Sequence, residues 1–144
     1  MQEIQIRIAE TDEDIFRCFS TMRELRPHLQ AENFLETIRQ FQASGYFLVM
    51  LEAGGDVGAV AGCRFSEHLA RGKFLYVDDL VTRTDLRRSG HGQKLFEWLV
   101  ILAETSGCRE LHLDSGVQRA DAHSFYEKQK MIFASRHYSL KLKP

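Results

Sequence analysis

One strand–helix–strand segment constrains the fold of this chain most strongly. Phe74–Thr82 is a mostly apolar run of the length and composition that predict a buried strand. A helix is expected from about Gly90 to Ser106, with Gly107 at the position where glycine commonly ends helices. Residues 110–114 then read as a short strand. A helix between two strands is a crossover connection, which predicts two parallel neighbours in one sheet.

The rest of the chain predicts further strands and helices around this unit. The expected elements are a strand at Ile4–Ile8, a helix capped by Thr11 and ending near Pro27, a helix at Glu32–Ala43, antiparallel strands at Tyr46–Ala53 and Val57–Glu67 joined by a Gly54-Gly55 turn, a helix at Ala120–Lys130, and one or two strands within Ile132–Leu142. We therefore expect an α/β protein with a mixed, mostly antiparallel sheet of six to seven strands. About four helices should cover both faces, in a single domain spanning residues 1–144.

Composition narrows the function classes. The chain is 44% apolar and 27% charged, with a formal net charge of −1 and no basic stripe, which argues against nucleic-acid binding. No apolar run is long enough to span a bilayer. Three isolated cysteines and a polar, acidic N-terminus favour a cytoplasmic protein. The histidines show no ligand spacing, so no metal site is expected.

A basic loop with two glycines leads into the long helix. Its sequence, residues 87–92, is Arg-Arg-Ser-Gly-His-Gly. The first turn of a helix has unpaired N–H groups and a partial positive charge, so it binds phosphates readily. Glycines let the backbone close around an anion, and Arg87 and Arg88 can add charge and paired hydrogen bonds. The P-loop motif is absent, and Leu95 replaces the third glycine of a dinucleotide motif. The alternative is a basic loop and helix cap without a ligand.

Two motifs together point to a known family. The segment YVDDLVTRTDLRRSGHGQKLFEWLV, residues 76–100, and the segment ADAHSFYEK, residues 120–128, resemble the strand–loop–helix unit and the later helix of the GNAT N-acetyltransferase superfamily. Their separation and the order of the expected elements also match that family across nearly the whole chain. The resemblance implies a GNAT-like acyl-CoA N-acyltransferase fold. It further implies an acyltransferase that moves an acetyl group from acetyl-CoA to a primary amine, by direct attack in a ternary complex.

The resemblance also assigns roles to particular residues. The pyrophosphate of CoA would lie on the backbone amides of Arg88, Ser89, Gly90, His91 and Gly92, next to Arg87. Leu80, Val81 and Thr82 would pair with the pantetheine arm as a neighbouring strand would. The Val81 N–H would stabilise the oxyanion. Tyr126 would contact CoA beside its sulfur and protonate the leaving thiolate.

A carboxylate is needed to take the proton of the attacking amine. Strand alternation places Tyr76, Asp78 and Leu80 on one face of their strand and Asp79 on the other. Relatives carry their base at positions matching Tyr76 and Asp78, so Asp78 is the expected base or amine anchor. Its alternative is a salt bridge, for example to an arginine of the first helices. For Asp79 a structural role is favoured.

Three positions depart from the family pattern. Arg119 stands where many relatives have an asparagine that touches the CoA arm. Lys130-Met131 replaces the common Gly-Phe, so the preceding helix is expected to need another cap. His91 stands where a small or aliphatic residue is common.

The acceptor and the partners are less constrained. Relatives bind the acceptor near residues 22–36, where cationic and anionic side chains are mixed. A small-molecule amine is favoured over a protein terminus. Many relatives dimerise, so a homodimer is an expectation that rests on the resemblance alone. The alternative functions are a non-catalytic acyl-CoA-binding or regulatory module on the same fold, or a nucleotide-phosphate binder unrelated to CoA.

Overall fold

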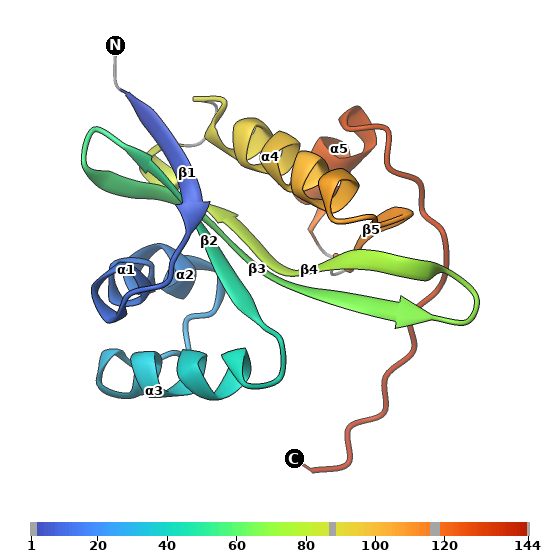
Figure 1. Ribbon diagram of the computed structural model, residues 1–144, viewed down its shortest axis with the longest axis horizontal. Coiled ribbons are helices and arrows are strands. Elements are labelled where there is room, and N and C mark those ends of the chain that lie inside the picture. The colour runs from blue at the N-terminus through green and yellow to red at the C-terminus, as the bar shows by residue number, and fades with distance from the viewer. Residues whose placement is uncertain (1–2, 87–88, 116–118, 144) are drawn as a thin grey trace. The chain divides into compact units, whose positions relative to one another are not determined.

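The computed structural model describes residues 3–86, 89–115 and 119–143 (Figure 1). By their internal contacts the residues form two compact units, Met1–His112 and Leu113–Pro144. In chain order the described elements are β1 (Ile4–Ile8), α1 (Asp12–Arg17), α2 (Phe19–Leu25), α3 (Ala31–Gln42), β2 (Phe47–Ala53), β3 (Asp56–His68), β4 (Gly72–Thr82), the 3-10 turn η1 (Thr84–Leu86), α4 (His91–Thr105), β5 (Glu110–Leu113) and α5 (Ala120–Lys128).

The strands form one sheet in the order β1-β2-β3-β4-β5. The first three neighbouring pairs are antiparallel. The Arg109 N–H, just before β5, donates to the Lys73 carbonyl at the start of β4 over 2.8 Å. Both strands therefore start at the same end, as a crossover through α4 requires. The predicted mixed, mostly antiparallel sheet is confirmed, but the described residues supply five strands rather than six to seven, and five α-helices rather than four.

Two expected elements differ from the structure. Residues 132–142 contain no strand, because within the described chain they pair with no other segment. A period-two pattern indicates an apolar face but does not supply a partner strand. The single helix expected after Thr11 is two helices, interrupted at Cys18, whose N–H donates to Ile15. The predicted N-cap is confirmed, since the Thr11 hydroxyl accepts from the Asp14 N–H at 3.1 Å.

Helices cover both faces of the sheet, as predicted. In Figure 1, α1, α2 and α3 lie on one side of β1–β4 and α4 lies on the other. The core on the first side is a continuous apolar cluster made of Ala9, Ile15, Cys18, Met22, Phe34, Ile38, Tyr46, Leu48, Met50, Val57, Val60 and Val81. On the second side, α4 buries Leu95 and Leu99 completely. β4 therefore lies between these two layers.

A β-bulge interrupts the pairing of β3 with β4. Gly62 lies opposite Asp79 and Cys63 opposite Val77, so Asp78 is the extra residue without a cross-strand partner. Only glycine fits at position 62, because a Cβ there would lie 1.8 Å from the Tyr46 hydroxyl oxygen and 2.6 Å from Asp79 Oδ2. The small residues of β3 therefore allow polar side chains to meet directly over the sheet.

The second unit has little core of its own. None of the residues of α5 is buried. The helix ends in a Schellman motif: the Met131 N–H donates to the Tyr126 carbonyl at 3.1 Å and the Lys130 N–H to Glu127 at 2.9 Å. Lys130 adopts φ 66°, so it takes the left-handed position that glycine usually fills. The expectation of a different cap was wrong: the cap is the usual one, built with a strained lysine.

Among the described helices, none combines the length and the apolar character needed to cross a membrane.

Candidate active site

The last part of β4 has one open side. β4 contains eleven residues and β5 only four. Because both strands start together, β5 reaches only the first part of β4. Within the described residues, no strand lies beside Leu80–Thr82 on the side away from β3. The backbone groups that point to that side are available to a ligand with an extended amide chain.

The direction of each backbone N–H in this stretch follows from one hydrogen bond. The Arg83 N–H donates to the Gly58 carbonyl of β3 at 2.9 Å. In an antiparallel pair the hydrogen-bonded positions recur every second residue, so Val81, opposite Val60, also directs its N–H toward β3. Leu80 and Thr82 direct theirs to the open side. The expected oxyanion donor, the Val81 N–H, therefore points away from the open edge.

Helix α4 begins directly after this strand and η1. Gly90 is its N-cap with φ 86°, a conformation that favours glycine. The first intrahelical bond runs from the Lys94 N–H to the Gly90 carbonyl at 3.0 Å. The N–H groups of His91, Gly92 and Gln93 precede that bond, as the donors of a first helical turn do. The N–H of Ser89, in contrast, is engaged with the Leu86 carbonyl at 3.3 Å. Arg87 and Arg88 lie outside the described residues.

The glycine at position 92 brings the helix close to β4. A Cβ there would lie 3.0 Å from the Thr82 hydroxyl oxygen, so the start of α4 and the open end of β4 are in near contact. The His91 ring is buried and lies over Gly58 of β3, where an added Cβ would come within 3.3 Å of Nδ1. The imidazole thus belongs to the packing of α4 on the sheet, and only the backbone of His91 faces the helix start.

Asp79 is held by two side chains from different elements. Tyr46 donates its hydroxyl to Oδ2 at 2.8 Å, and Arg26, at the end of α2, donates to Oδ1 at 2.9 Å. Arg26 also donates to the Asp78 carbonyl at 3.1 Å. Burial and then the nearby Asp79 charge raise the pKa of Tyr46, which keeps its hydroxyl a donor. These contacts match the structural role expected for Asp79, tying a loop to the sheet.

Asp78 is bonded on one oxygen only. Oδ2 accepts from Arg64 Nε at 2.9 Å, whereas Oδ1 is buried and has no hydrogen-bond partner among the described residues. Burial is the main cause that raises the pKa of Asp78, and the Arg64 hydrogen bond opposes it. A salt bridge to an arginine was the expected alternative, but it comes from β3 and not from the first helices.

The bulge also changes which face the two carboxylates occupy. The Arg64 guanidinium bound to Asp78 lies 5.5 Å from the centre of the Tyr46 ring, and Tyr46 bonds Asp79. Both carboxylates therefore lie on the side of α1–α3, although simple alternation predicts opposite faces. Leu80 lies one step beyond Asp79, on the other face from Asp78. The sequence gives no signal for this extra residue, because bulge positions depend on pairing with β3.

Tyr126 lies on α5 in the second unit. Its ring packs edge-to-face against Phe125, with ring centres 5.6 Å apart. Burial raises the pKa of the phenol and the charge of Arg119 lowers it, with a net upward shift. The hydroxyl is therefore protonated at neutral pH, as a general acid must be. Arg119, the departure from the usual asparagine, precedes α5 as its N-cap.

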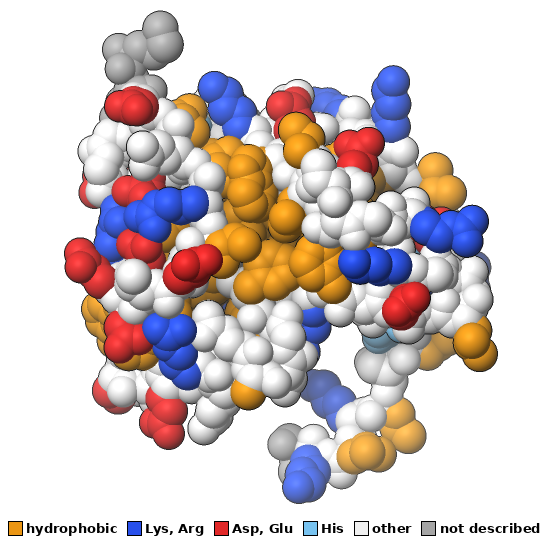
Figure 2. Space-filling view, viewed as in Figure 1, with side chains coloured by type: hydrophobic (Ala, Val, Ile, Leu, Met, Phe, Trp, Pro, Cys, Tyr) orange, Lys and Arg blue, Asp and Glu red, His pale blue; other side chains and the backbone are white. Residues whose placement is uncertain are grey.

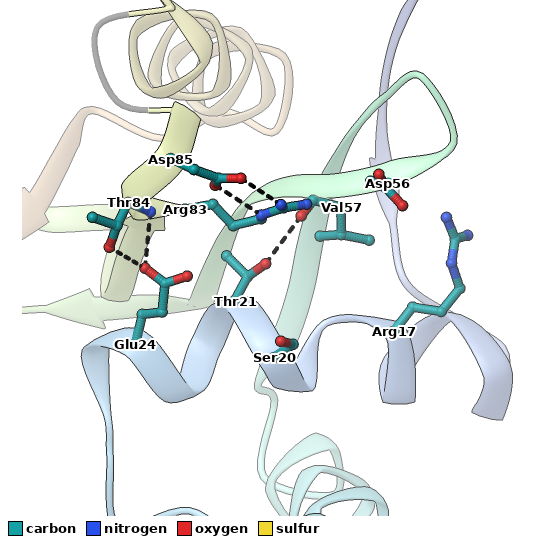
Figure 3. A pocket seen from close by; sticks show the side chains of 9 residues that line it. All are labelled: Arg17, Ser20, Thr21, Glu24, Asp56, Val57, Arg83, Thr84 and Asp85. Atoms are coloured by element: carbon teal, nitrogen blue, oxygen red, sulfur yellow. Dashed lines mark hydrogen bonds and ion pairs between the residues drawn. The ribbon is translucent and has the colours of Figure 1, made fainter.

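A polar pocket of about 530 Å³ opens between α1–α2 and the start of η1 (Figure 3). Its lining residues are Arg17, Ser20, Thr21, Glu24, Asp56, Val57, Arg83, Thr84 and Asp85. Glu24, one of the expected acceptor residues, accepts from the Thr84 N–H at 2.9 Å. Arg83 directly follows β4, five residues after Asp78, or ~17 Å at ~3.4 Å per residue. The Arg83 side of the pocket therefore lies well away from Asp78.

Within residues 3–86, 89–115 and 119–143, no three histidine, cysteine or acidic side chains gather into a group that could hold a metal ion.

Comparison with known proteins agrees with this architecture. The model of the acetyltransferase (GNAT) family matches residues 8–131. A Bacillus subtilis protein named as the uncharacterized N-acetyltransferase YhdJ is 30% identical over 136 residues, which is 94% of this chain and 95% of that one.

Two solved structures share the fold. One is an aminoglycoside N-acetyltransferase, AAC(6')-Iy, in complex with CoA; it has 13% identity and a TM-score of 0.86, covering 100% of this chain and 97% of its own. The other is glucosamine-6-phosphate N-acetyltransferase from Arabidopsis thaliana, with 22% identity and a TM-score of 0.77 over 98% of this chain and 99% of its own. The open strand, the glycine-lined helix start and these matches together show that the chain belongs to the GNAT family and is an N-acetyltransferase.

Proposed function

We propose that this enzyme transfers the acetyl group of acetyl-CoA to a primary amine of a small molecule, by direct attack within a ternary complex. The observation that carries the proposal is the open edge of β4 at Leu80–Thr82, which ends beside the start of α4: a Cβ added to Gly92 would lie 3.0 Å from the Thr82 hydroxyl oxygen. The pantetheine arm of CoA is an extended chain with amide groups that leads to a pyrophosphate. Such a ligand needs a strand backbone to pair with and, next to it, a helix N-terminus for the phosphates.

The donor's phosphates fit the helix start for steric and electrostatic reasons. A side chain at position 92 would fill the space in front of Thr82, so glycine keeps that space open. The first-turn N–H groups of α4 and the backbone of Ser89 and Gly90 would surround the pyrophosphate, and Arg87 and Arg88 would add positive charge. The pantetheine arm would bond to the outward N–H and carbonyl groups of Leu80 and Thr82.

The chemistry needs a base, an oxyanion donor and an acid. Asp78 is proposed to take a proton from the amine on Oδ1, the oxygen without a bond. The amine nitrogen, now neutral, attacks the thioester carbon, and the C–S bond breaks as the tetrahedral intermediate collapses. The remaining extra proton on the nitrogen passes to solvent, from which Tyr126 is reprotonated after the step below. The oxyanion donor is reassigned from Val81 to the Leu80 N–H, because only the latter faces the open edge. Tyr126 gives its proton to the leaving thiolate.

The acceptor is proposed to approach from the α1–α3 side, where the Asp78 carboxylate lies. Arg64 donates to that carboxylate and Arg26 to the Asp78 carbonyl, so an acceptor that also carries an anionic or hydroxyl group would find guanidinium groups there. Two proteins of the same fold are named for small amines, an aminoglycoside and glucosamine 6-phosphate. These names support a small-molecule acceptor and identify none for this enzyme.

Both compact units are proposed to form one catalytic domain. The family model spans residues 8–131 and therefore crosses the boundary at residue 112. The proposed acid, Tyr126, and the proposed base, Asp78, come from different units, so neither unit alone would be active. The alternative, a non-catalytic acyl-CoA-binding module, requires neither of these two side chains.

An acceptor screen tests the proposal. Acetyl-CoA would be mixed with the enzyme and with aminoglycosides, phosphorylated aminosugars, polyamines or peptides with free N-termini, and thiol release would be followed. We expect thiol release well above hydrolysis with at least one small amine. Release with peptides only would refute the small-molecule acceptor. Tight acetyl-CoA binding without thiol release for any amine would favour the non-catalytic module.

A further inference from the structure

Arg64 carries hydrogen-bonding capacity that the fold leaves unused. Its Nε donates to Asp78 Oδ2 at 2.9 Å, which is a single bond and not the paired contact that a guanidinium often makes with a carboxylate. Within the part of the chain that the structure describes, Nη1 and Nη2 of Arg64 have no acceptor. The side chain is 36% exposed, so a ligand can reach the guanidinium.

Two aromatic rings fix the position of this guanidinium. Its Cζ lies 5.5 Å from the centre of the Tyr46 ring and 5.9 Å from the centre of the Phe41 ring. An arginine that is already held by stacking and by a hydrogen bond loses less side-chain entropy when it binds an anion. Phe41 is itself 44% exposed, so an apolar surface lies next to the guanidinium. Arg64 is therefore arranged as an anion-binding group before any ligand arrives.

The charges around Asp78 leave open one place for an amine and one for an anion. Both oxygens of Asp79 are bonded, and Arg26 donates to Asp79 and to the Asp78 carbonyl. The groups left open among the described residues are Asp78 Oδ1 and the two outer nitrogens of Arg64. Two guanidiniums and two carboxylates already balance there. An alkylammonium alone would add an uncompensated positive charge, whereas an amine that also carries an anion adds no net charge.

The wider surface does not itself attract anions. Residues 12–42, which contain α1–α3, carry more acidic than basic side chains. Figure 2 shows acidic side chains interspersed with basic ones over these helices, at the left of the view. Such a surface attracts the ammonium end of an approaching acceptor. Recognition of an anionic end must therefore come from a local group, and Arg64 supplies such a group beside the proposed base.

We propose that the acceptor is an amine that also carries a carboxylate or a phosphate, and that Arg64 binds this anionic group while Asp78 receives the amine. The inference rests on the proposed function, because it concerns the acceptor of that same reaction. Arg64 would position the acceptor without taking part in proton transfer, since a guanidinium stays protonated at every working pH. Its planar fork can meet two anionic oxygens at once, which gives the selection its strength.

Matched acceptor pairs test the proposal through a ratio of specificities. Glucosamine 6-phosphate with glucosamine, phosphoethanolamine with ethanolamine, and 4-aminobutyrate with butylamine are pairs that differ in the anion and share the amine. With acetyl-CoA saturating, kcat/KM should favour the anionic member of at least one pair by ~10- to 100-fold. The first two pairs report on a phosphate and the third on a carboxylate. Equal kcat/KM in every pair, with thiol released from both members, would overturn the inference and leave the proposed function intact.

Substitution of Arg64 tests which residue causes the preference. Arg64→Gln removes the charge and the fork, so it should bring the ratio close to one. Because Arg64 also bonds Asp78, the variant can change the base, but that change affects both members of a pair and cancels in the ratio. Arg71→Gln is the matched control, since Arg71 also stacks on an aromatic ring, Phe74, at 5.7 Å, and precedes β4. It should keep the wild-type ratio. A ratio that Arg64→Gln leaves unchanged would overturn the role of Arg64.

Equilibrium binding gives a readout that does not depend on turnover. The enzyme saturated with CoA would be titrated with each acceptor by calorimetry, and the anionic member of a pair should bind at least ~10-fold more tightly than the neutral one. If no acceptor releases thiol from acetyl-CoA, the proposed function fails and this binding preference alone decides the inference. Absence of a preference in both measurements would overturn it.

Discussion

The open end of β4 and the bulge in the same strand lie a few residues apart, but they offer different chemical groups to a ligand. From Leu80 to Gly92 the groups available to a ligand are backbone amides, at an open strand edge and at a helix start. At Asp78 and Asp79 the available groups are side chains, in a network with Tyr46, Arg26 and Arg64. Backbone donors suit a donor substrate shared across a family, whereas side chains can differ between acceptors. Substitutions should therefore separate donor binding from turnover.

Within the bulge, two adjacent carboxylates also differ. Both oxygens of Asp79 have partners, and one oxygen of Asp78 has none among the described residues. A saturated carboxylate stabilises the fold, and an under-satisfied one is available for chemistry. We expect substitution of Asp79 to change stability and substitution of Asp78 to change activity.

The largest effect is expected for Gly92→Glu. The new side chain would place bulk against Thr82 and negative charge in the phosphate site, so acetyl-CoA affinity should fall more than ~1000-fold. Titration calorimetry would measure the loss. Gly92→Ala separates bulk from charge and should lose less affinity. If Gly92→Glu folds and binds acetyl-CoA normally, the phosphate site is not at α4.

Tyr126→Phe should lower kcat by ~100-fold or more while acetyl-CoA affinity changes less than ~3-fold, because only the proton donor is removed. Steady-state kinetics with the acceptor found by screening would measure kcat. Tyr138→Phe removes a hydroxyl from an exposed tyrosine and is the matched control, with unchanged kcat expected. Equal kcat in the two variants would remove Tyr126 from the mechanism.

Asp78→Asn should lower kcat/KM by ~100-fold and abolish its acidic limb. Burial raises the pKa of Asp78 above the ordinary ~3.9, so the base of the wild type is lost on acidification at a higher pH than an ordinary carboxylate would be. The same shift disfavours the ionised form in the folded state, so this group stabilises least at high pH. The pH dependence of kcat/KM measures the acidic limb, and unfolding at several pH values measures the stability. An acidic limb that is unchanged in Asp78→Asn would exclude Asp78 as the base.

Asp79→Asn should destabilise the fold by ~1–3 kcal/mol, because it weakens the bond to Arg26 and leaves the buried Tyr46 hydroxyl with a poorer acceptor. Urea unfolding would measure the change, and acetyl-CoA affinity should stay within ~3-fold. A stable variant without activity would contradict the division between the two carboxylates.

The smallest effect is expected at the end of α5. Lys130→Gly should stabilise the protein by ~0.5–1 kcal/mol, because glycine adopts φ 66° without the Cβ penalty that lysine carries. A thermal unfolding midpoint that falls would show that the lysine side chain has contacts worth more than its strain.

The sequence predicted most of the elements that lie in the first unit. Thr11, the Gly54-Gly55 turn and Gly107 are local signals, and the positive φ angles of all three glycines agree with the expected ends and turn. The parallel pair around α4 and the hairpin of β2 with β3 were also predicted. What local patterns could not give was the bulge at Asp78, since it arises from the register between β3 and β4. It reversed the expected face of Asp79.

The candidate site shows the same limit. A phosphate site could be predicted at the glycine loop because helix starts bind anions whatever their side chains. The partners of the carboxylates could not be predicted, because Arg26, Tyr46 and Arg64 come from other parts of the chain. The proposed oxyanion donor is the Leu80 N–H rather than the Val81 N–H for a related reason: which N–H faces the open edge depends on pairing with β3 and not on residue type. The strand expected within residues 132–142 is absent from the described structure, because a sequence pattern cannot tell whether a partner strand exists.

Calorimetric titration of the unmodified protein tests whether the β4 edge and the start of α4 form the donor site. Acetyl-CoA, CoA, ADP and NAD would be compared under one condition. We expect one site that binds acetyl-CoA and CoA, binds ADP more weakly because the pantetheine arm is missing, and does not bind NAD. Equal affinity for ADP and CoA would contradict the role of the β4 edge. Absence of acetyl-CoA binding by the folded protein would contradict the donor site altogether.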